Sequence, residues 1–536
     1  MTTAQPPRVA AGAIAAGALL ALTACGAGGD AADASPQDGG TLRYGLSAVP
    51  ICPDPQQASQ NQAVYIARQV VDSLTDQDPE TGEIVPWLAE SWEVNPELTE
   101  FTFHLRDGVT FSDGTGLNAE SVQKNFDAIA GDFSPFAPLG SSFLAGYAET
   151  RVDEDLTATV VFESPNAQFL QATSTFSLGL VADATLQAAP EDRCRGEVIG
   201  SGPFTFGEFV ADQSVTVERR DGYAWGSSLF ERDGEAYLEA IEFTVVPESG
   251  VRSGSLASDQ LDAISDVLPQ DEPAIEAADG TILTVANPGV AFGFQPNVED
   301  PILSDPAVRA ALIPAIDRQE IVDVVLGDRF HAATSPLAHL TPGWTDLSDR
   351  LGHDPQAAAD QLEAAGWTEG ADGIREKDGR PLRVKVIFGE AFSASQTVLE
   401  LVQQQLKAVG VDLDVQQLPA ADMTAATEAG DYALYFSNLS RTDPDILRRT
   451  FSTDFANVNR RGADAELDGL LEAQLSEPDT EARYAIVAEV QEVLLDRAYH
   501  VPLFELSQAI GTGANVHGLA FDASARLQFH DVWLAG

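Results

Sequence analysis

The fold is predicted most clearly by residues Phe101–Asp127, FTFHLRDGVTFSDGTGLNAESVQKNFD. The first six of these residues alternate between apolar and polar side chains, which is typical of a half-buried strand. Asp107-Gly108 supplies turn chemistry before the alternation resumes at Val109, so the pattern predicts a β-hairpin. Asn118 then has the position of a helix cap, and apolar residues spaced four and three apart follow it. The stretch therefore predicts a strand, a hairpin and a helix in one α/β unit.

Sequence motifs in and around this stretch resemble a known family. Residues 105–122 contain the run L-R-D-G-V-x-F-x-D-G-x-x-L-x-A-E-x-V, and residues 86–92 read P-W-L-A-E-S-W. Both resemble segments of the family 5 extracellular solute-binding proteins of ABC importers, which bind peptides, oligopeptides and nickel. Further similar segments are spread along the chain: GGTL at 39–42, GSGPF at 200–204, D-P-A-V-R-A-A-L-x-x-A-I-D-R at 305–318 and VPLF at 501–504.

The resemblance implies a periplasmic-binding-protein-like α/β fold, with two α/β lobes, a hinge and an extra α+β subdomain. The sequence supports the α/β class of the second lobe, because residues 382–388, 395–409 and 411–418 predict a strand, a helix and a strand joined by a parallel crossover. We expect lobe I to comprise residues 41–75, 195–285 and 500–536, the extra subdomain residues 76–194, and lobe II residues 286–499.

The first forty residues predict export rather than a folded domain. Arg8 precedes an apolar run at residues 9–22 that is too short to cross a membrane and has the length of a signal-peptide core. Leu22-Thr23-Ala24-Cys25 resembles a bacterial lipobox, so residues 1–25 are interpreted as a lipoprotein signal peptide in which Cys25 becomes lipid-modified. The alternative is a chance cysteine. Residues 26–40 predict a flexible tether, and the protein is expected outside the cytoplasm, anchored by lipid to the outer face of the bacterial cell membrane.

Length and charge exclude some classes of function. A chain of 536 residues is too long for one ordinary core and predicts two or three domains. Thirty Lys and Arg against 83 Asp and Glu give a net charge of −53, which argues against nucleic-acid binding. The acidity predicts a solvated surface, and attraction of cationic ligands is the alternative. Cys52 and Cys194 are expected to form a disulfide after export, which contributes on the order of 4 kcal/mol in the chain-entropy model.

Motifs of enzymes and of metal sites are absent from the sequence. None of the four lysines is followed by Ser or Thr as in a phosphate-binding loop, and neither G-x-S-x-G nor H-E-x-x-H occurs. The closest histidines, His331 and His339, are better explained as a chance pair than as metal ligands. We expect no catalytic residues, no cofactor and no metal, although a catalytic pair among the many carboxylates remains an open alternative.

The best candidate for a ligand site is the stretch Asp431–Asp445, DYALYFSNLSRTDPD. Its alternating apolar residues predict a buried strand that brings residues 438–445 to the carboxyl end, where α/β domains bind ligands. In related peptide binders this region resembles W-x-x-D-x-x-D-P, in which the first Asp pairs with the α-ammonium group of the peptide. Counting back from Asp443-Pro444 places Ser440 at that position, so this chain lacks the carboxylate.

The residues beside Ser440 offer a different chemistry. Arg441 can hold a carboxylate or phosphate through two parallel hydrogen bonds, and Asp443 can orient its guanidinium group. We therefore expect Asn438, Ser440, Arg441 and Asp443 to contact the ligand. The alternative is a turn in which Asp443-Pro444 only ends the strand and Arg441 is solvated.

The resulting hypothesis is a substrate-binding lipoprotein of an ABC importer, not an enzyme. We expect a peptide or another small molecule as ligand, an ABC permease in the membrane as partner, contact with the membrane through the lipid anchor, no nucleic acid and a monomeric chain. The alternatives are a cell-surface hydrolase and an adhesion or chaperone module on a similar scaffold. Whether the ligand is a peptide, an opine, a sugar or a metal chelate stays open.

Overall fold

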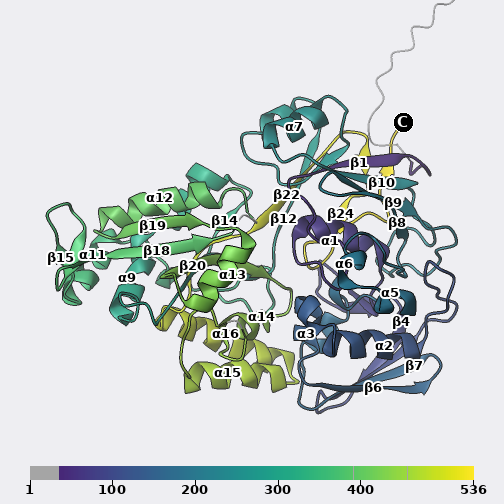
Figure 1. Ribbon diagram of the computed structural model, residues 1–536, viewed down its shortest axis with the longest axis horizontal. Coiled ribbons are helices and arrows are strands. Elements are labelled where there is room, and N and C mark those ends of the chain that lie inside the picture. The colour runs from purple at the N-terminus through teal and green to yellow at the C-terminus, as the bar shows by residue number, and fades with distance from the viewer. Residues whose placement is uncertain (1–34, 390–391, 456) are drawn as a thin grey trace, which may run out of the picture. The chain divides into compact units, whose positions relative to one another are not determined.

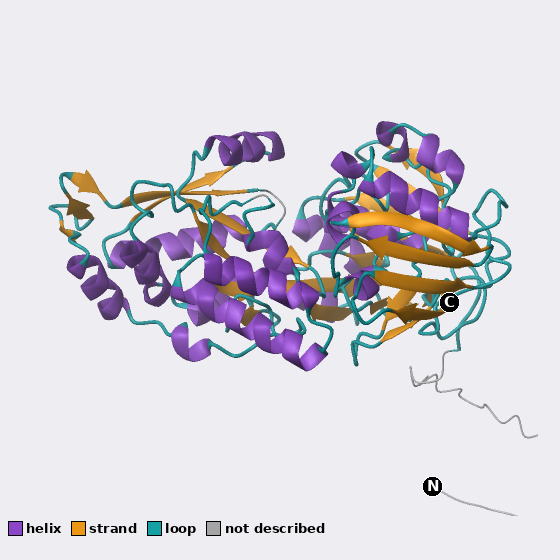
Figure 2. Ribbon diagram, turned by 90° about the horizontal axis from the view of Figure 1, so that it is seen from below, coloured by secondary structure: helices purple, strands orange, loops and turns teal. Residues whose placement is uncertain are grey.

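Two mixed β-sheets form the centres of two lobes in the computed structural model (Figure 1). The structure describes residues 35–389, 392–455 and 457–536. The predicted signal peptide, the lipobox with Cys25 and most of the predicted tether therefore lie outside the described residues. Between Pro36 and Gly536 the chain forms one compact unit. Helices pack against the sheets of both lobes (Figure 2), as the predicted α/β class requires.

Lobe I is built on a seven-stranded sheet with the strand order β12-β22-β11-β1-β10-β9-β8. Its central strand β1 pairs in parallel with β10 and β11, and the outer pairs are antiparallel. The strands are β1 (Thr41–Leu46), β8 (Phe204–Val210), β9 (Ser214–Arg219), β10 (Ala240–Val245), β11 (Ala263–Ile264), β12 (Thr281–Ala286) and β22 (Ser507–Thr512). The helices of this lobe are α1 (Asn61–Ala67), α7 (Ser249–Ala257) and α8 (Glu272–Glu276). Short pairs β23·β26 (Val516–His517, Trp533–Leu534) and β24·β25 (Ala520–Phe521, Leu527–Gln528) end the chain.

Lobe II is built on a six-stranded sheet with the strand order β14-β21-β13-β20-β18-β19. The predicted crossover is confirmed, because β18 (Arg383–Phe388) and β19 (Asp412–Gln417) are parallel and α12 (Ser395–Ala408) connects them. The other strands are β13 (Gly289–Pro296), β14 (His331–Ala332), β20 (Leu434–Ser440) and β21 (Val501–Glu505). The helices are α9 (Pro306–Ala315), α10 (Arg318–Ile321), α11 (Pro355–Ala364), α13 (Ala420–Ala429), α14 (Ile446–Phe451), α15 (Ala465–Ser476) and α16 (Thr480–Asp496). A small sheet comprises β15 (Thr368–Glu369), β16 (Arg375–Lys377) and β17 (Arg380–Pro381).

The extra subdomain has a four-stranded antiparallel sheet in the order β4-β5-β7-β6, with α2 packed against β6 and β7 (Figure 1). Its strands are β4 (Ala89–Val94), β5 (Glu100–Leu105), β6 (Tyr147–Glu154) and β7 (Thr157–Phe162), and β2 (Thr75–Gln77) pairs with β3 (Ile84–Pro86) beside it. Its helices are α2 (Ala119–Ala130), α3 (Pro138–Phe143), α4 (Phe169–Ala172), α5 (Asp183–Gln187) and α6 (Pro190–Arg193).

The stretch Phe101–Asp127 contains the start of a helix, as predicted, but the predicted hairpin is wrong. Asn118 caps α2 in a capping box with Ser121. Residues after Asp107-Gly108 form only an isolated bridge between Thr110 and Gly116. The strand β5 instead pairs with β4, which precedes it across the short loop 95–99, and with the more distant β7, so both of its edges are occupied.

Two chain crossings connect the sheets of the two lobes. One is the pair Asn287-Pro288 between β12 and β13, and the other is the single residue Leu506 between β21 and β22. The Asn287 backbone N–H donates to the Leu506 carbonyl over 2.7 Å, so the crossings lie side by side. The sequence-based boundary at residue 500 needs correction, since β21 pairs with β13 of lobe II and the chain returns to lobe I only at Leu506.

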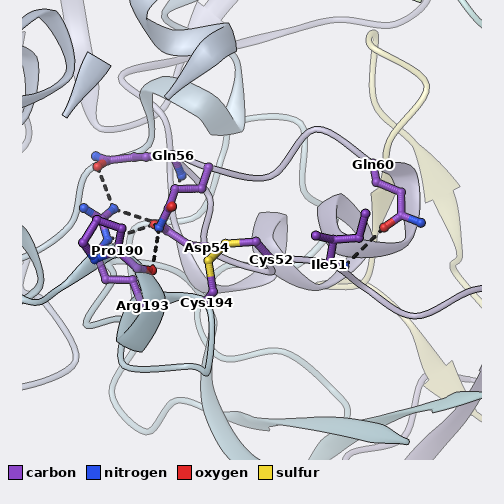
Figure 3. Close-up of a disulfide and its surroundings, with 9 residues drawn as sticks. Ile51, Cys52, Asp54, Gln56, Gln60, Pro190, Arg193 and Cys194 are labelled. Carbon is purple, nitrogen blue, oxygen red and sulfur yellow. Dashed lines mark hydrogen bonds and ion pairs between the residues drawn. A yellow bond between two sulfur atoms is a disulfide. The ribbon is translucent and has the colours of Figure 1, made fainter. Parts of the chain in front are cut away.

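Cys52 and Cys194 are bonded to each other across a sequence separation of 142 (Figure 3). Next to this disulfide, Arg193 forms a buried ion pair with Asp54, with 2.8 Å between Nε and Oδ2. The same guanidinium group donates to Gln56 over 2.8 Å and lies 4.2 Å above the Phe133 ring. The disulfide and the ion pair therefore fasten the segment after β1 to the end of the extra subdomain.

The carboxylate of Asp72 lies where lobe I meets the extra subdomain, and it is fully buried. It accepts hydrogen bonds from the Tyr223 hydroxyl (3.0 Å) and from the Trp225 Nε1 (2.9 Å). The Asp72 backbone N–H donates to Ser201 Oγ over 3.0 Å. Burial nevertheless raises the pKa of Asp72 to about 7, although these two donors and the nearby Arg68 and Arg220 act in the opposite direction.

The glycines of the GSGPF segment allow the chain to approach Asp72. A Cβ atom at Gly200 would lie 1.8 Å from the Val70 carbonyl oxygen, and one at Gly202 would lie 2.5 Å from the Val70 carbonyl carbon. No side chain larger than hydrogen fits at either position. Backbone contact at Val70 therefore fixes Ser201 beside Asp72.

We predict that stability decreases as the pH rises through the range in which Asp72 loses its proton. A carboxyl group whose pKa is higher in the folded than in the unfolded state stabilises the fold while it is protonated, and this contribution is lost between its unfolded pKa near 4 and its folded pKa near 7. Urea unfolding at about pH 5 and about pH 7.5 measures the difference. Asp72→Asn should reduce this pH dependence, whereas Asp132→Asn, at an exposed position, should leave it unchanged; equal slopes in both variants would contradict the assignment.

Candidate functional site

The candidate ligand stretch lies at the carboxyl end of β20, in the middle of the lobe II sheet. The sequence predicted that residues 438–445 lie at the carboxyl end of a strand. In the structure β20 runs to Ser440, so Asn438 and Ser440 belong to the end of the strand itself. Ser440 pairs with Gly289 at the start of β13. Gly289 has a φ of +124°, and a Cβ there would lie 2.2 Å from the Leu439 carbonyl oxygen. The strand end therefore contacts the first crossing directly.

A chain of hydrogen bonds connects this strand end to lobe I. Asn287 Nδ2 donates to Ser440 Oγ over 3.1 Å, and Gln508 Nε2 donates to Asn287 Oδ1 over 3.2 Å. The Tyr65 hydroxyl of α1 donates to Gln508 Oε1. Asn438 Nδ2 also lies 3.4 Å from Ser440 Oγ. The polar network thus runs from α1 through Gln508 of β22 and the crossing residue Asn287 to the residue that replaces the expected aspartate.

Arg441 is buried and bridges the lobe II loop to the extra subdomain. Its guanidinium group donates to Gln168 Oε1 (3.0 Å) and to Ser142 Oγ (2.7 Å), and it lies 4.0 Å above the Phe143 ring. Burial lowers the pKa of Arg441 to about 10, so the group remains charged at neutral pH. The edge of the guanidinium group is therefore hydrogen-bonded and one of its faces is covered by a ring. Arg441 is not the solvated side chain of a simple turn.

Asp443 does not orient Arg441 as the sequence had suggested. Its carboxylate accepts two hydrogen bonds from Arg483 of α16, at 2.9 Å and 2.6 Å. The carboxylate nearest to Arg441 belongs to Asp445, at 3.9 Å, and this group pairs more closely with Arg448 at 2.7 Å. The reason is chain geometry: the turn after Ser440 directs Asp443 toward the helices of lobe II.

Thr442 provides a second contact between the loop and lobe I. Its hydroxyl lies 3.0 Å from Ser524 Oγ and donates to the Ala523 carbonyl over 3.3 Å. Together, Arg441 and Thr442 place the strand end against the subdomain and against the C-terminal segment. The arrangement offers hydrogen-bond donors and acceptors from both lobes, as a binding site for a small polar solute requires.

Two further features concern metals and membranes. The His331 and His339 rings lie 5.2 Å apart, and His339 Nδ1 contacts the Glu505 carboxylate, yet the described part of the chain contains no group of three metal-ligating side chains. Over residues 35–389, 392–455 and 457–536, no helix has the length and hydropathy needed to cross a bilayer.

Sequence reasoning placed the four candidate residues on one strand end, and the structure shows which partners they have. It missed Tyr65, Asn287 and Gln508, which complete the network around Ser440. All three residues lie in stretches without a recognised motif. Asn287 and Gln508 can be identified once the crossings are known, because Asn287 lies in one crossing and Gln508 follows the other by two residues.

The comparisons with known proteins give a consistent result. A family model described as bacterial extracellular solute-binding proteins, family 5 middle, matches residues 83–457. The nickel-binding periplasmic protein of Escherichia coli is 24% identical over 80% of this chain and 82% of that protein. The dipeptide-binding protein of Escherichia coli is 27% identical over 54% of this chain and 56% of that protein.

Solved structures agree in fold. NikA from Brucella suis, in complex with Fe(III)-EDTA, has a TM-score of 0.81 at 23% identity and covers 92% of this chain and 100% of its own. AppA from Bacillus subtilis, in complex with a nonapeptide, has a TM-score of 0.79 at 21% identity, with 94% and 100% covered. The two-lobed α/β architecture described above is therefore the fold that these binding proteins share.

We predict that Arg441→Ala destabilises the protein even without ligand. Removing a buried charged donor deletes hydrogen bonds worth about 1.5–3 kcal/mol and leaves Gln168 Oε1 without its donor. Arg460→Ala is the matched control, because Arg460 forms an ion pair with Glu299 at the surface of the same lobe, and such pairs contribute about 1 kcal/mol or less. Urea unfolding measures both variants. Equal losses in the two would show that Arg441 is not a bridging residue.

Proposed function

The chain belongs to family 5 of the bacterial extracellular solute-binding proteins, and from this premise we propose how it holds its solute. Proteins of this family are non-enzymatic, extracytoplasmic substrate-binding proteins of ABC importers for peptides, nickel or other small solutes. The open questions are therefore where the solute binds, what it is and how the protein reaches its permease.

We propose that the solute binds at the strand end formed by Asn438 and Ser440, between the two lobes. The observation that carries this proposal is the hydrogen-bonded series from Tyr65 through Gln508 and Asn287 to Ser440. This series couples the strand end to the crossing residue Asn287, whose backbone is bonded to the other crossing at Leu506, so a solute that hydrogen-bonds there acts on the hinge. Arg441 and Asp443 serve the same site by holding the loop, through the subdomain and through Arg483 respectively.

Capture then follows from differential affinity. A solute that contacts residues of both lobes stabilises the conformation in which the lobes are close, and closure involves rotation at the two crossings. The closed form is the one we propose that the permease recognises. Ser440 replaces the carboxylate that pairs with an α-ammonium group in related peptide binders, so a free amine is not the group that this strand end selects.

The ligand class differs among relatives of this fold. NikA from Brucella suis was solved with Fe(III)-EDTA, and AppA from Bacillus subtilis with a nonapeptide. For this chain we therefore propose a small solute with hydrogen-bonding groups, peptide-like or otherwise, and a direct measurement has to identify it.

Native mass spectrometry of the full chain purified from its own host tests the proposal. We expect a complex heavier than the chain by one small molecule, which is released on denaturation. Asn438→Ala should weaken rebinding of the released solute several-fold, because one hydrogen bond contributes about 0.5–1.5 kcal/mol. The control Gln417→Ala changes an exposed residue of β19 and should bind normally. A chain without any bound solute, or one that binds equally well after Asn438→Ala, would contradict the proposed site.

We also propose that Cys25 carries the lipid that anchors the protein to the outer face of the cell membrane. The support is the sequence Leu22-Thr23-Ala24-Cys25 behind an apolar run, together with the composition of residues 26–40. Growth with a palmitate analogue should label the wild-type chain and not Cys25→Ala, and the variant should appear in the soluble extracytoplasmic fraction. Equal labelling of both chains would refute the anchor.

A further inference from the structure

Arg526 is a buried arginine in the C-terminal segment of lobe I whose hydrogen-bonding capacity is largely unused. Its side chain is 92% buried, with a residue exposure of 8%. Nη1 donates to Asn61 Oδ1, whereas Nε is buried and none of the described residues accepts a hydrogen bond from it. A guanidinium group has five N–H donors, so most of the donors of Arg526 have no protein acceptor in the described chain.

Three other buried arginines have carboxylate partners. Arg193, Arg448 and Arg483 each form an ion pair with a buried aspartate at 2.6–2.8 Å. Arg318 donates to four backbone carbonyls. No carboxylate among the described residues lies within 4.0 Å of the nitrogen atoms of Arg526, and the same holds for Arg68, whose Nε and Nη2 are also buried without an acceptor. Burying an unpaired charge is costly. Arg68 lies 4.4 Å above the Trp87 ring, whereas Arg526 has no such ring contact among the described residues.

Asp522 is the carboxylate whose charge acts on Arg526, but the two side chains do not form a direct ion pair. Its Oδ1 accepts hydrogen bonds from the backbone N–H groups of Ser524 and Arg526, which folds the segment into a turn. Burial raises the pKa of Asp522, with Arg68 and Arg526 opposing this shift. Burial also lowers the pKa of Arg526. The positive charge of Arg526 thus remains without a fixed counter-ion.

The position of Arg526 relates it to the proposed solute site. Ser524, two residues earlier, contacts Thr442 of lobe II at 3.0 Å, and the Ala525 carbonyl accepts a hydrogen bond from Gln508. Gln508 belongs to the series of hydrogen bonds that ends at Ser440. Asn61 lies one helical turn before Tyr65 in α1. Arg526 is therefore surrounded by the same elements that hold the strand end of Asn438 and Ser440.

We propose that Arg526 binds an anionic group of the solute, a carboxylate or a phosphate, from the lobe I side of the site. This inference rests on the proposed function and specifies its substrate class: a small anion that also hydrogen-bonds to Asn438 and Ser440. A planar guanidinium with free donors matches the two oxygen atoms of either group. Such a solute would supply the counter-ion that the protein lacks.

Calorimetric titration of the full chain, stripped of bound solute, tests the inference at constant ionic strength. The probes are succinate, its uncharged analogue succinamide, and inorganic phosphate. We expect succinate, phosphate or both to bind and succinamide not to bind; succinate alone indicates a carboxylate site, and phosphate alone a phosphate site. Binding of neither anion, or equal binding of succinate and succinamide, would overturn the inference.

Variants identify the residue. Arg526→Gln should weaken the bound anion about tenfold to a hundredfold, as expected for loss of a charge-assisted contact. Arg526→Lys should recover part of the affinity, because it restores the charge without the planar fork. Arg460→Gln, which removes a surface charge of lobe II, is the control for general electrostatics. Equal weakening by Arg460→Gln and Arg526→Gln would refute a specific site. If Arg526→Gln fails to fold, the titration of the wild-type chain still decides whether an anion binds.

The solute released in native mass spectrometry separates this inference from the proposed function. An anionic solute supports both. A neutral or cationic solute would leave the proposed capture function intact and would overturn the role of Arg526, whereas absence of any solute would count against the proposed function itself.

Discussion

The buried carboxylate of Asp72 is the contact that joins distant segments of lobe I at its border with the extra subdomain. It receives donors from Tyr223 and Trp225, and its backbone N–H binds Ser201. These partners come from segments more than a hundred residues away from Asp72 in the chain. An unpaired carboxylate at this depth would cost several kcal/mol, so each donor is required for the others to remain in place. Its raised pKa shows that this compensation is incomplete.

Two of the motifs that relate this chain to its family lie beside Asp72 rather than at the proposed solute site. Gly200 and Gly202 approach the backbone of Val70 too closely for any side chain. Arg220 donates to the Ser201 carbonyl and to the Phe111 carbonyl of the L-R-D-G-V-x-F run. The shared sequence therefore specifies the scaffold. In the proposed function, the choice of solute belongs to residues outside these motifs, such as Ser440 and Arg526, which is why membership of the family leaves the ligand open.

Local patterns predicted most of the elements, and they failed where pairing depends on distant segments. The cap at Asn118 and the crossover from β18 to β19 follow from short-range spacing, and both are confirmed. The hairpin after β5 was wrong because strand partners come from elsewhere in the chain. For the proposed site, the sequence predicted the strand end but not the partners of its residues. Its partners Tyr65, Asn287 and Gln508 are distributed over more than four hundred residues, and no periodicity connects them.

The two crossings set the mechanical freedom of the molecule. One contains Asn287-Pro288 and the other Leu506, and a hydrogen bond of 2.7 Å joins them. Proline fixes one backbone torsion, so few rotatable bonds remain between the lobes. Two short links side by side form a hinge. They permit rotation about the line through both links and oppose rotation about other axes. Ser440 is hydrogen-bonded to Asn287, so a solute at the proposed site would act directly on one of these two links.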